Sequence, residues 1–210
     1  GRRDSAASRR LKIAQMPENF LDPAYLAGGN ERQRATHGVL SELRIFEVLA
    51  SYQPMLSGTI PLAIDIPESD LDVLCEVHDF DGFAEALHTA YGHEENFKQS
   101  TFKSGRDGPY RTASFSHGGF VIEIFGQSLP VTEQAAYRHM MIQARLLDLG
   151  GEALRREIIT LRRAGLKTEP AFARRLAVAG DPYVALLALE ALDDDGLARL
   201  LDDAAEAHRG

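Results

Sequence analysis

Cysteine is scarce in this sequence: Cys75 is the single one among 210 residues. An internal disulfide and a zinc site with several cysteine ligands are therefore excluded. Cys75 falls in the apolar register of an expected strand, which favours a buried thiol over a reactive one. The histidines, including His88 and His93, show no spacing typical of zinc ligands.

Long apolar runs are also missing. No stretch approaches the roughly 20 residues that a membrane-spanning helix needs. The arginine-rich start of the sequence lacks the apolar centre of a secretory signal. We therefore expect a soluble protein of the cytoplasm.

Basic residues are fewer than acidic ones: the sequence has 23 lysines and arginines and 31 aspartates and glutamates, which gives a net charge of −8. Phosphate contacts on duplex nucleic acid come from clustered lysine and arginine. The balance therefore argues against a large surface for long duplexes, and it favours a small acceptor molecule over long nucleic acid.

The residues that are present predict an ordered α+β protein, since 44% are apolar and no repeat or low-complexity tract occurs. Residues 1–30 show little periodicity and are interpreted as a partly flexible arm. We expect a catalytic domain over 31–128, in which helices flank a small mixed sheet, and a helical bundle over 129–210.

The periodicity predicts individual elements within this frame. Strands are expected over 55–56, 70–77, 97–103, 110–116 and 120–125. Helices are expected over 31–51, 80–91, 132–149, 152–164, 170–179, 182–192 and 196–207. The expected N-cap residues are Asp79, Thr132, Thr168 and Asp181.

Two carboxylates on one strand are the most informative feature. Asp70 and Asp72 are spaced i, i+2, so they project from one face of the strand, while Leu71, Val73 and Cys75 project from the other. Their Cα atoms lie roughly 7 Å apart, which lets both side chains converge on one cation or on a metal pair about 4 Å apart. Without a cation, such like charges raise each other's pKa and weaken the fold.

A third acid interrupts the apolar strand 120–125 at Glu123, and on a neighbouring strand it would complete a triad with the two aspartates. Mg²⁺ prefers oxygen ligands, so such a triad suits Mg²⁺ and the phosphates of a substrate, and we expect two ions, both held by Asp70 and Asp72, with Glu123 completing the catalytic one. Glu123 could bind the catalytic metal or accept the proton of the acceptor. Gly58 and Thr59 form a turn that lets backbone and hydroxyl approach phosphate oxygens. Ser69, directly before Asp70, is assigned to the same nucleotide site.

These residues resemble the signature of the nucleotidyltransferase superfamily that includes DNA polymerase β. The signature comprises Gly58-Thr59, Asp70-Leu-Asp72 and the later acid in Val121-Ile-Glu123-Ile124. Residues 58–72, Ala136-Tyr-Arg-His-Met140 and Gly165-Leu-Lys-Thr-Glu-Pro-Ala-Phe172 are also similar to a bacterial family of small, uncharacterised nucleotidyltransferase-like proteins. The resemblance implies a mixed sheet flanked by helices, metal held by the three acids, and a nucleoside triphosphate such as ATP at the Gly-Thr turn. The superfamily usually has Gly-Ser or Gly-Gly there, whereas Thr59 keeps the hydroxyl and adds a methyl group.

Three cations are candidate contacts for the triphosphate. Lys103 and Arg111 are expected on strands between the two acid-bearing ones, and Lys167 in the loop before Pro170. The roles of four further residues stay open. Asp65 either adds charge near the metal or caps a turn, and Glu169 either binds a ligand or opposes a helix dipole. Tyr137 either stacks on a base or is a core residue. His139 either transfers a proton or is an ordinary exposed histidine.

The sequence thus predicts a Mg²⁺-dependent nucleotidyltransferase that moves a nucleoside monophosphate to a hydroxyl of a small molecule, a protein or an RNA end. Three alternatives are a catalytically silent relative that binds a nucleotide or a partner, a metal-dependent phosphohydrolase, and a strand whose acids are merely solvated. Base preference, acceptor and oligomeric state stay open.

Overall fold

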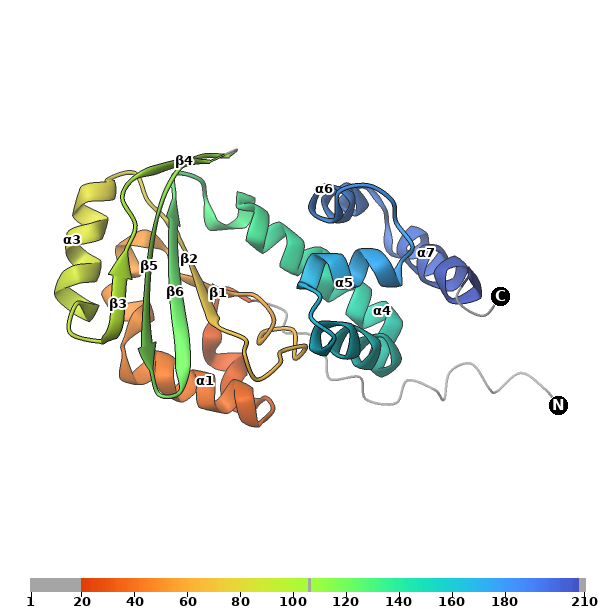
Figure 1. Ribbon diagram of the computed structural model, residues 1–210, viewed down its shortest axis with the longest axis horizontal. Coiled ribbons are helices and arrows are strands. Elements are labelled where there is room, and N and C mark those ends of the chain that lie inside the picture. Colours follow the sequence, from red (N-terminus) through yellow and green to blue (C-terminus); the bar gives the residue numbers. More distant parts are fainter. Residues whose placement is uncertain (1–19, 106, 208–210) are drawn as a thin grey trace. The chain divides into compact units, whose positions relative to one another are not determined.

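The computed structural model describes residues 20–105 and 107–207 (Figure 1). Within them the chain divides into two compact units, one ending at Met140 and the other beginning at Met141. Most of the expected arm of residues 1–30 lies outside the described residues. Its described end forms the short 3₁₀ helix η2 (Pro23–Gly28), in which Leu26 is buried.

The first unit is built on a six-stranded mixed sheet, as the α+β prediction required. The strands follow the order β1-β2-β6-β5-β3, and β4 pairs with β5. β2 and β6 run parallel, whereas the other pairs are antiparallel. The strand bounds are β1 Met55–Ser57, β2 Leu71–Glu76, β3 Glu95–Gln99, β4 Lys103–Gly105, β5 Gly108–His117 and β6 Phe120–Gln127.

Helices α1 (Glu31–Glu42) and α3 (Phe80–Tyr91) cover one face of this sheet (Figure 1). The apolar side chains of β2 that the period-two pattern assigned to one face, Leu71, Val73 and Cys75, are fully buried against them. Burial raises the pKa of the Cys75 thiol, so this cysteine is the core residue that the sequence predicted.

The expected helix over residues 31–51 is wrong in its length. It breaks into α1, α2 (Ile45–Val48) and the 3₁₀ turn η3 (Ala50–Tyr52), with Arg44 at a φ of 51°. In one continuous helix Leu43 and Ile45 would point about 200° apart, so one of them would face water. The break buries both, and the Tyr91 hydroxyl donates a hydrogen bond to the Leu43 carbonyl at 3.3 Å.

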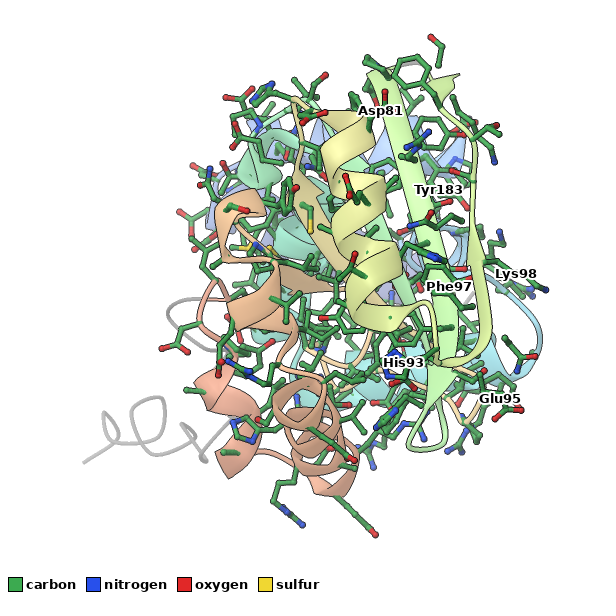
Figure 2. All side chains as sticks on the ribbon, turned by 90° about the vertical axis from the view of Figure 1, so that its left-hand side faces the viewer. Asp81, His93, Glu95, Phe97, Lys98 and Tyr183 are labelled. Carbon is green, nitrogen blue, oxygen red and sulfur yellow. The ribbon has the colours of Figure 1, made fainter. Side chains whose placement is uncertain are left out.

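The expected strand over residues 97–103 is likewise two strands, β3 and β4. Between them Ser100 forms two hydrogen bonds with Thr112 of β5. The Ser100 N–H donates to the Thr112 carbonyl, and the Ser100 hydroxyl accepts from the Thr112 N–H. β3 is an edge strand that carries Glu95 and Lys98 outward (Figure 2). Charged side chains on an edge discourage pairing with another sheet.

Beyond the sheet the chain is helical, as expected. The elements are η4 Val131–Glu133, α4 Ala135–Arg163 with a kink at Gly151, α5 Thr168–Arg175, α6 Pro182–Ala188, η5 Leu189–Ala191 and α7 Asp194–Ala207. Asp79 and Asp181 are N-caps as predicted, but Thr132 and Thr168 are not, because Pro130 and Lys167 occupy the N-cap positions of η4 and α5. None of the described helices combines the length and apolar character that crossing a membrane requires.

Candidate metal centre

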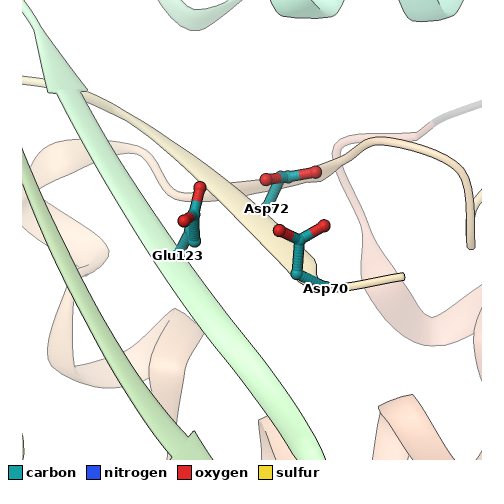
Figure 3. Close-up of side chains that lie close together, drawn as sticks. All are labelled: Asp70, Asp72 and Glu123. Carbon is teal, nitrogen blue, oxygen red and sulfur yellow. The ribbon is translucent and has the colours of Figure 1, made fainter. Parts of the chain in front are cut away.

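Three carboxylates meet on the face of the sheet opposite α1 and α3. Asp70 directly precedes β2, Asp72 lies within it, and Asp72 is the register partner of Glu123 on the parallel neighbour β6. One oxygen from each lies within 4.8 Å of the others (Figure 3). In the described part of the chain this is the one group of three such ligands. The predicted triad therefore forms, with all three acids on one side.

The electrostatics of the triad are those of acids that lie close together and are partly buried. Asp70 and Asp72 are half-buried, and Glu123 is more exposed. Partial burial of the Glu123 carboxyl raises its pKa, and the negative charge of Asp70 raises that pKa further. A divalent cation would remove this repulsion. Oxygen ligands at this spacing fit a hard ion such as Mg²⁺ or Mn²⁺.

Gly58 follows β1 and lies against the Asp72 carboxylate. Its φ is 88°, in the region that favours glycine, and a Cβ atom here would lie 2.6 Å from Asp72 Oδ2. Ser57, the residue before it, is the β1 register partner of Asp72. Two features therefore require glycine at this position: the backbone conformation and the closeness to the Asp72 carboxylate.

The loop between β1 and β2 joins the other predicted nucleotide residues. The Thr59 hydroxyl donates to the Ser69 hydroxyl at 3.2 Å, and Ser69 Oγ also accepts from the Ile66 N–H at 3.0 Å. Thr59 and Ser69 are thus held together beside Gly58 and Asp70. The Ser69 hydroxyl therefore has two hydrogen-bond partners in the loop, and the Thr59 hydroxyl, which donates to it, can also accept hydrogen bonds.

Two residues that the sequence reasoning missed hold this loop from α1. Gln33 Nε2 donates to the carbonyl oxygens of Ile60 and Pro61 at 2.9 and 3.3 Å. Arg32 Nη2 donates to the Pro67 and Ser69 carbonyls at 3.2 and 3.1 Å. The spacing Asn30-x-x-Gln33 is a capping-box signal that could have marked the start of α1, but no local pattern indicates these contacts about 30 residues away.

Asp65 faces Arg32 rather than the three acids of the triad. Its Oδ2 lies 4.0 Å from Arg32 Nε. The group of potential metal ligands does not include Asp65. The ion pair therefore favours the interpretation of Asp65 as a residue that holds the loop.

Lys103 and Arg111 lie on β4 and β5, which come between the acid-bearing strands in the sequence but not in the sheet, because β2 and β6 are direct neighbours. Arg111 lies on the helix-covered face, where its Nη1 donates to the Phe80 carbonyl at 2.9 Å and contacts Asp81. Lys103 is at the level of Gln127, four residues and roughly 13 Å along β6 from Glu123. Neither cation lies beside the triad.

The remaining candidates lie around the helical region. Lys167 is the N-cap residue of α5 in the second unit, so its contact with a triphosphate stays a prediction. Glu169 is an acid of the first turn of α5 and accepts a hydrogen bond from Gln143 Nε2 at 3.3 Å. On α4, His139 is buried and Tyr137 is half-buried.

Comparison with known proteins gives a family. The profile described as domain of unknown function (DUF4269) matches residues 38–189, which is most of the sequence. The chain belongs to the DUF4269 family. This match does not confirm the expected likeness to a bacterial family of small nucleotidyltransferase-like proteins. No curated protein matches the DUF4269 chain.

Several solved structures resemble the DUF4269 protein at low identity. Cid1, described as an RNA terminal uridylyl transferase, is 12% identical with a TM-score of 0.48 over 78% of this chain and 52% of its own. The polymerase core of TRAMP, an RNA surveillance complex, is 15% identical with a TM-score of 0.46 over 87% and 60%. The structure of the GLD-2/RNP-8 complex is 10% identical, with a TM-score of 0.48 over 88% of this chain and 83% of its own. The chain spans about half the length of Cid1.

Proposed function

We propose that this DUF4269 protein is a Mg²⁺-dependent nucleotidyltransferase that moves a nucleoside monophosphate from a triphosphate to a hydroxyl acceptor. The observation that carries the proposal is the convergence of Asp70, Asp72 and Glu123 within 4.8 Å beside the Gly58 turn. The acceptor would be a small molecule, a protein or an RNA end. Low-identity resemblance to RNA-modifying transferases adds no argument about the acceptor.

The three acids would hold one or two Mg²⁺ ions, which offset the charge that develops on the leaving pyrophosphate. The Gly58 backbone and the hydroxyls of Thr59 and Ser69 would orient the phosphate oxygens. Glu123 would bind metal or accept the proton of the acceptor hydroxyl as its oxygen attacks the α-phosphorus and the bond to the bridging oxygen breaks.

The test is transfer from labelled triphosphates. The purified protein is incubated with Mg²⁺, a cell extract and each triphosphate labelled at the α-phosphate, and labelled acceptors are separated. We expect a labelled product whose formation Asp70→Asn slows by about a hundred- to a thousandfold, because removing transition-state charge stabilisation has effects of this size. Asp81→Asn, an exposed acid on α3, is the matched control and should retain activity.

Three results would overturn the proposal in different ways. Free nucleotide as the sole product, formed without any acceptor, would indicate a phosphohydrolase. Binding of the triphosphate without turnover, unaffected by Mg²⁺, would indicate a silent relative of the transferases. Equal activity in wild type and Asp70→Asn would remove the triad from the chemistry.

A further inference from the structure

A row of side chains crosses the sheet at the level of the triad. Its members are direct register partners, so they share one face of the sheet. They are Ser57 on β1, Asp72 on β2, Glu123 on β6, Ser114 on β5 and Lys98 on β3. The row begins next to the Gly58 turn and ends on a cation.

Lys98 points away from the helices that cover the other face. Its neighbours in β3 turn toward α3: the Phe97 ring lies 5.8 Å from the His88 ring, and Gln99 Nε2 donates to the Ala84 carbonyl at 2.8 Å. Lys98 is exposed on the opposite side (Figure 2). Within residues 20–105 and 107–207 its ammonium group forms no ion pair or hydrogen bond.

The order of the row assigns the two substrates to its two ends. This inference rests on the proposed function, in which the triphosphate occupies the β1 end, where the Gly58 turn, Thr59 and Ser69 lie. The acceptor must then approach Glu123 from the other side, over β5 and β3. Two strand spacings separate Lys98 from Glu123, which is roughly 10 Å between their Cα atoms. An extended lysine side chain spans part of that distance.

We propose that Lys98 binds a phosphate group of the acceptor and that the natural acceptor is therefore a phosphate-bearing hydroxyl compound. A lysine ammonium is a point charge suited to phosphate, and the hydroxyl of Ser114, which lies between Lys98 and Glu123, adds a donor. A cationic acceptor such as an amino sugar would be repelled by Lys98. The phosphate would lie roughly 10 Å or less from the reacting hydroxyl.

A binding experiment tests this role without turnover. The protein is loaded with Mn²⁺ and a non-hydrolysable nucleoside triphosphate, and the ³¹P relaxation of added inorganic phosphate is measured. We expect paramagnetic relaxation that places this phosphate about 10 Å from the metal. The effect should be lost in Lys98→Gln and kept in Lys98→Arg.

The matched control is Lys103→Gln, because Lys103 is exposed on another strand of the same sheet and lies roughly 13 Å along β6 from the row. It should leave the relaxation unchanged. A lysine that merely guards the edge strand would give no phosphate signal in the wild type, or the same signal in Lys98→Gln. Either result overturns the proposal. Failure to bind Mn²⁺ and triphosphate would instead overturn the proposed function itself.

Labelling of cell extract gives the second readout. The extract is divided by anion exchange, and we expect labelled product from the retained fraction alone. Lys98→Gln should raise the KM for that fraction about tenfold or more with kcat little changed, as expected for loss of a charge-assisted contact. Lys98→Arg should have a KM for that fraction close to the wild-type value. Product from the unretained fraction, or an unchanged KM in Lys98→Gln, would contradict a phosphate-bearing acceptor.

Discussion

At the scale of the residue, the candidate site depends on close contact between a backbone and a charge. A Cβ atom on Gly58 would overlap Asp72 Oδ2, although these residues are fourteen positions apart in the sequence. The Asp72 carboxylate is in turn fixed opposite Glu123 by the parallel pairing of β2 and β6. Gly58 thus sets the position of the Asp72 carboxylate as well as the shape of the turn.

Gly58→Ala should therefore damage metal binding. The φ of 88° strains any L-residue by about 1 kcal/mol or more, and the added methyl group displaces the Asp72 carboxylate. We expect at least a tenfold loss of Mn²⁺ affinity, measured by calorimetry, together with this loss of stability. Gly119→Ala is the control, because Gly119 has a φ of 81° and open space around its Cα. It should cost similar stability but leave Mn²⁺ affinity unchanged; equal loss in both variants would refute the specific role of Gly58.

The pair Asp70 and Asp72 was predictable from sequence because its signal is local, whereas the place of Glu123 beside it depends on the pairing of β2 with β6. Asp70 and Asp72 share a face in any strand, and Glu123 interrupts an apolar strand. The positions of Lys103 and Arg111 were not predictable, because they depend on strand order, and β6 inserts between β2 and β5. The same non-local order brings Lys98 to the row.

At the scale of the element, α1 supports the loop between β1 and β2, which carries Thr59 and Ser69. Gln33 joins three features: it completes the capping box with Asn30, and its amide donates to the Ile60 and Pro61 carbonyls. Arg32 donates hydrogen bonds to the Pro67 and Ser69 carbonyls, and its guanidinium group lies 4.2 Å from the centre of the Phe120 ring. The loop is thus fixed by side chains from a helix that itself makes no contact with substrate in the proposed reaction.

Gln33→Ala should loosen that loop. Two carbonyl groups lose their side-chain donor in a buried place, which costs about 1–3 kcal/mol of the free energy of unfolding. Urea unfolding measures this loss, and the KM for triphosphate should rise with it. Gln53→Ala removes an exposed hydrogen bond to Glu76 and is the control, with an expected loss below about 0.5 kcal/mol. Equal values for the two variants would show that α1 does not support the loop.

The end of β5 carries a pH-dependent contact. His117 Nδ1 lies 2.8 Å from Glu94 Oε2, and Nε2 lies 3.5 Å from Glu42 Oε2 on α1. The hydrogen bond to Glu94 raises the pKa of His117, and burial partly opposes it. Because the folded-state pKa exceeds the unfolded value of about 6.5, the stabilisation is complete below that value and is lost as pH rises through the folded-state pKa.

His117→Gln should therefore remove a pH dependence. Urea unfolding is measured between about pH 5.5 and 8.5 for both proteins. We expect the stability difference between wild type and variant to be largest at the acidic end and to shrink as pH rises. A difference that stays constant, or that grows with pH, would contradict the assigned contact.

At the scale of the whole molecule, the sequence predicts the fold class and the succession of a helix, a sheet and trailing helices. It fails where packing overrides local pattern, as at Arg44, where the helix breaks so that Leu43 and Ile45 are both buried. Hydrogen bonds between segments far apart in the sequence were also not predictable. Gln134, just before α4, donates to the carbonyls of Cys75 and Leu129, and the first compact unit extends to Met140.

The central claim is that three acids of one sheet face hold catalytic divalent metal. The most direct measurement is a crystal structure of the full chain with Mn²⁺ and a non-hydrolysable triphosphate, with anomalous scattering used to locate the ion. We predict Mn²⁺ at about 2.1–2.2 Å from oxygens of Asp70, Asp72 and Glu123, with the triphosphate beside Gly58. Saturating Mn²⁺ with no ion at these carboxylates, or with the triphosphate bound elsewhere, would contradict it.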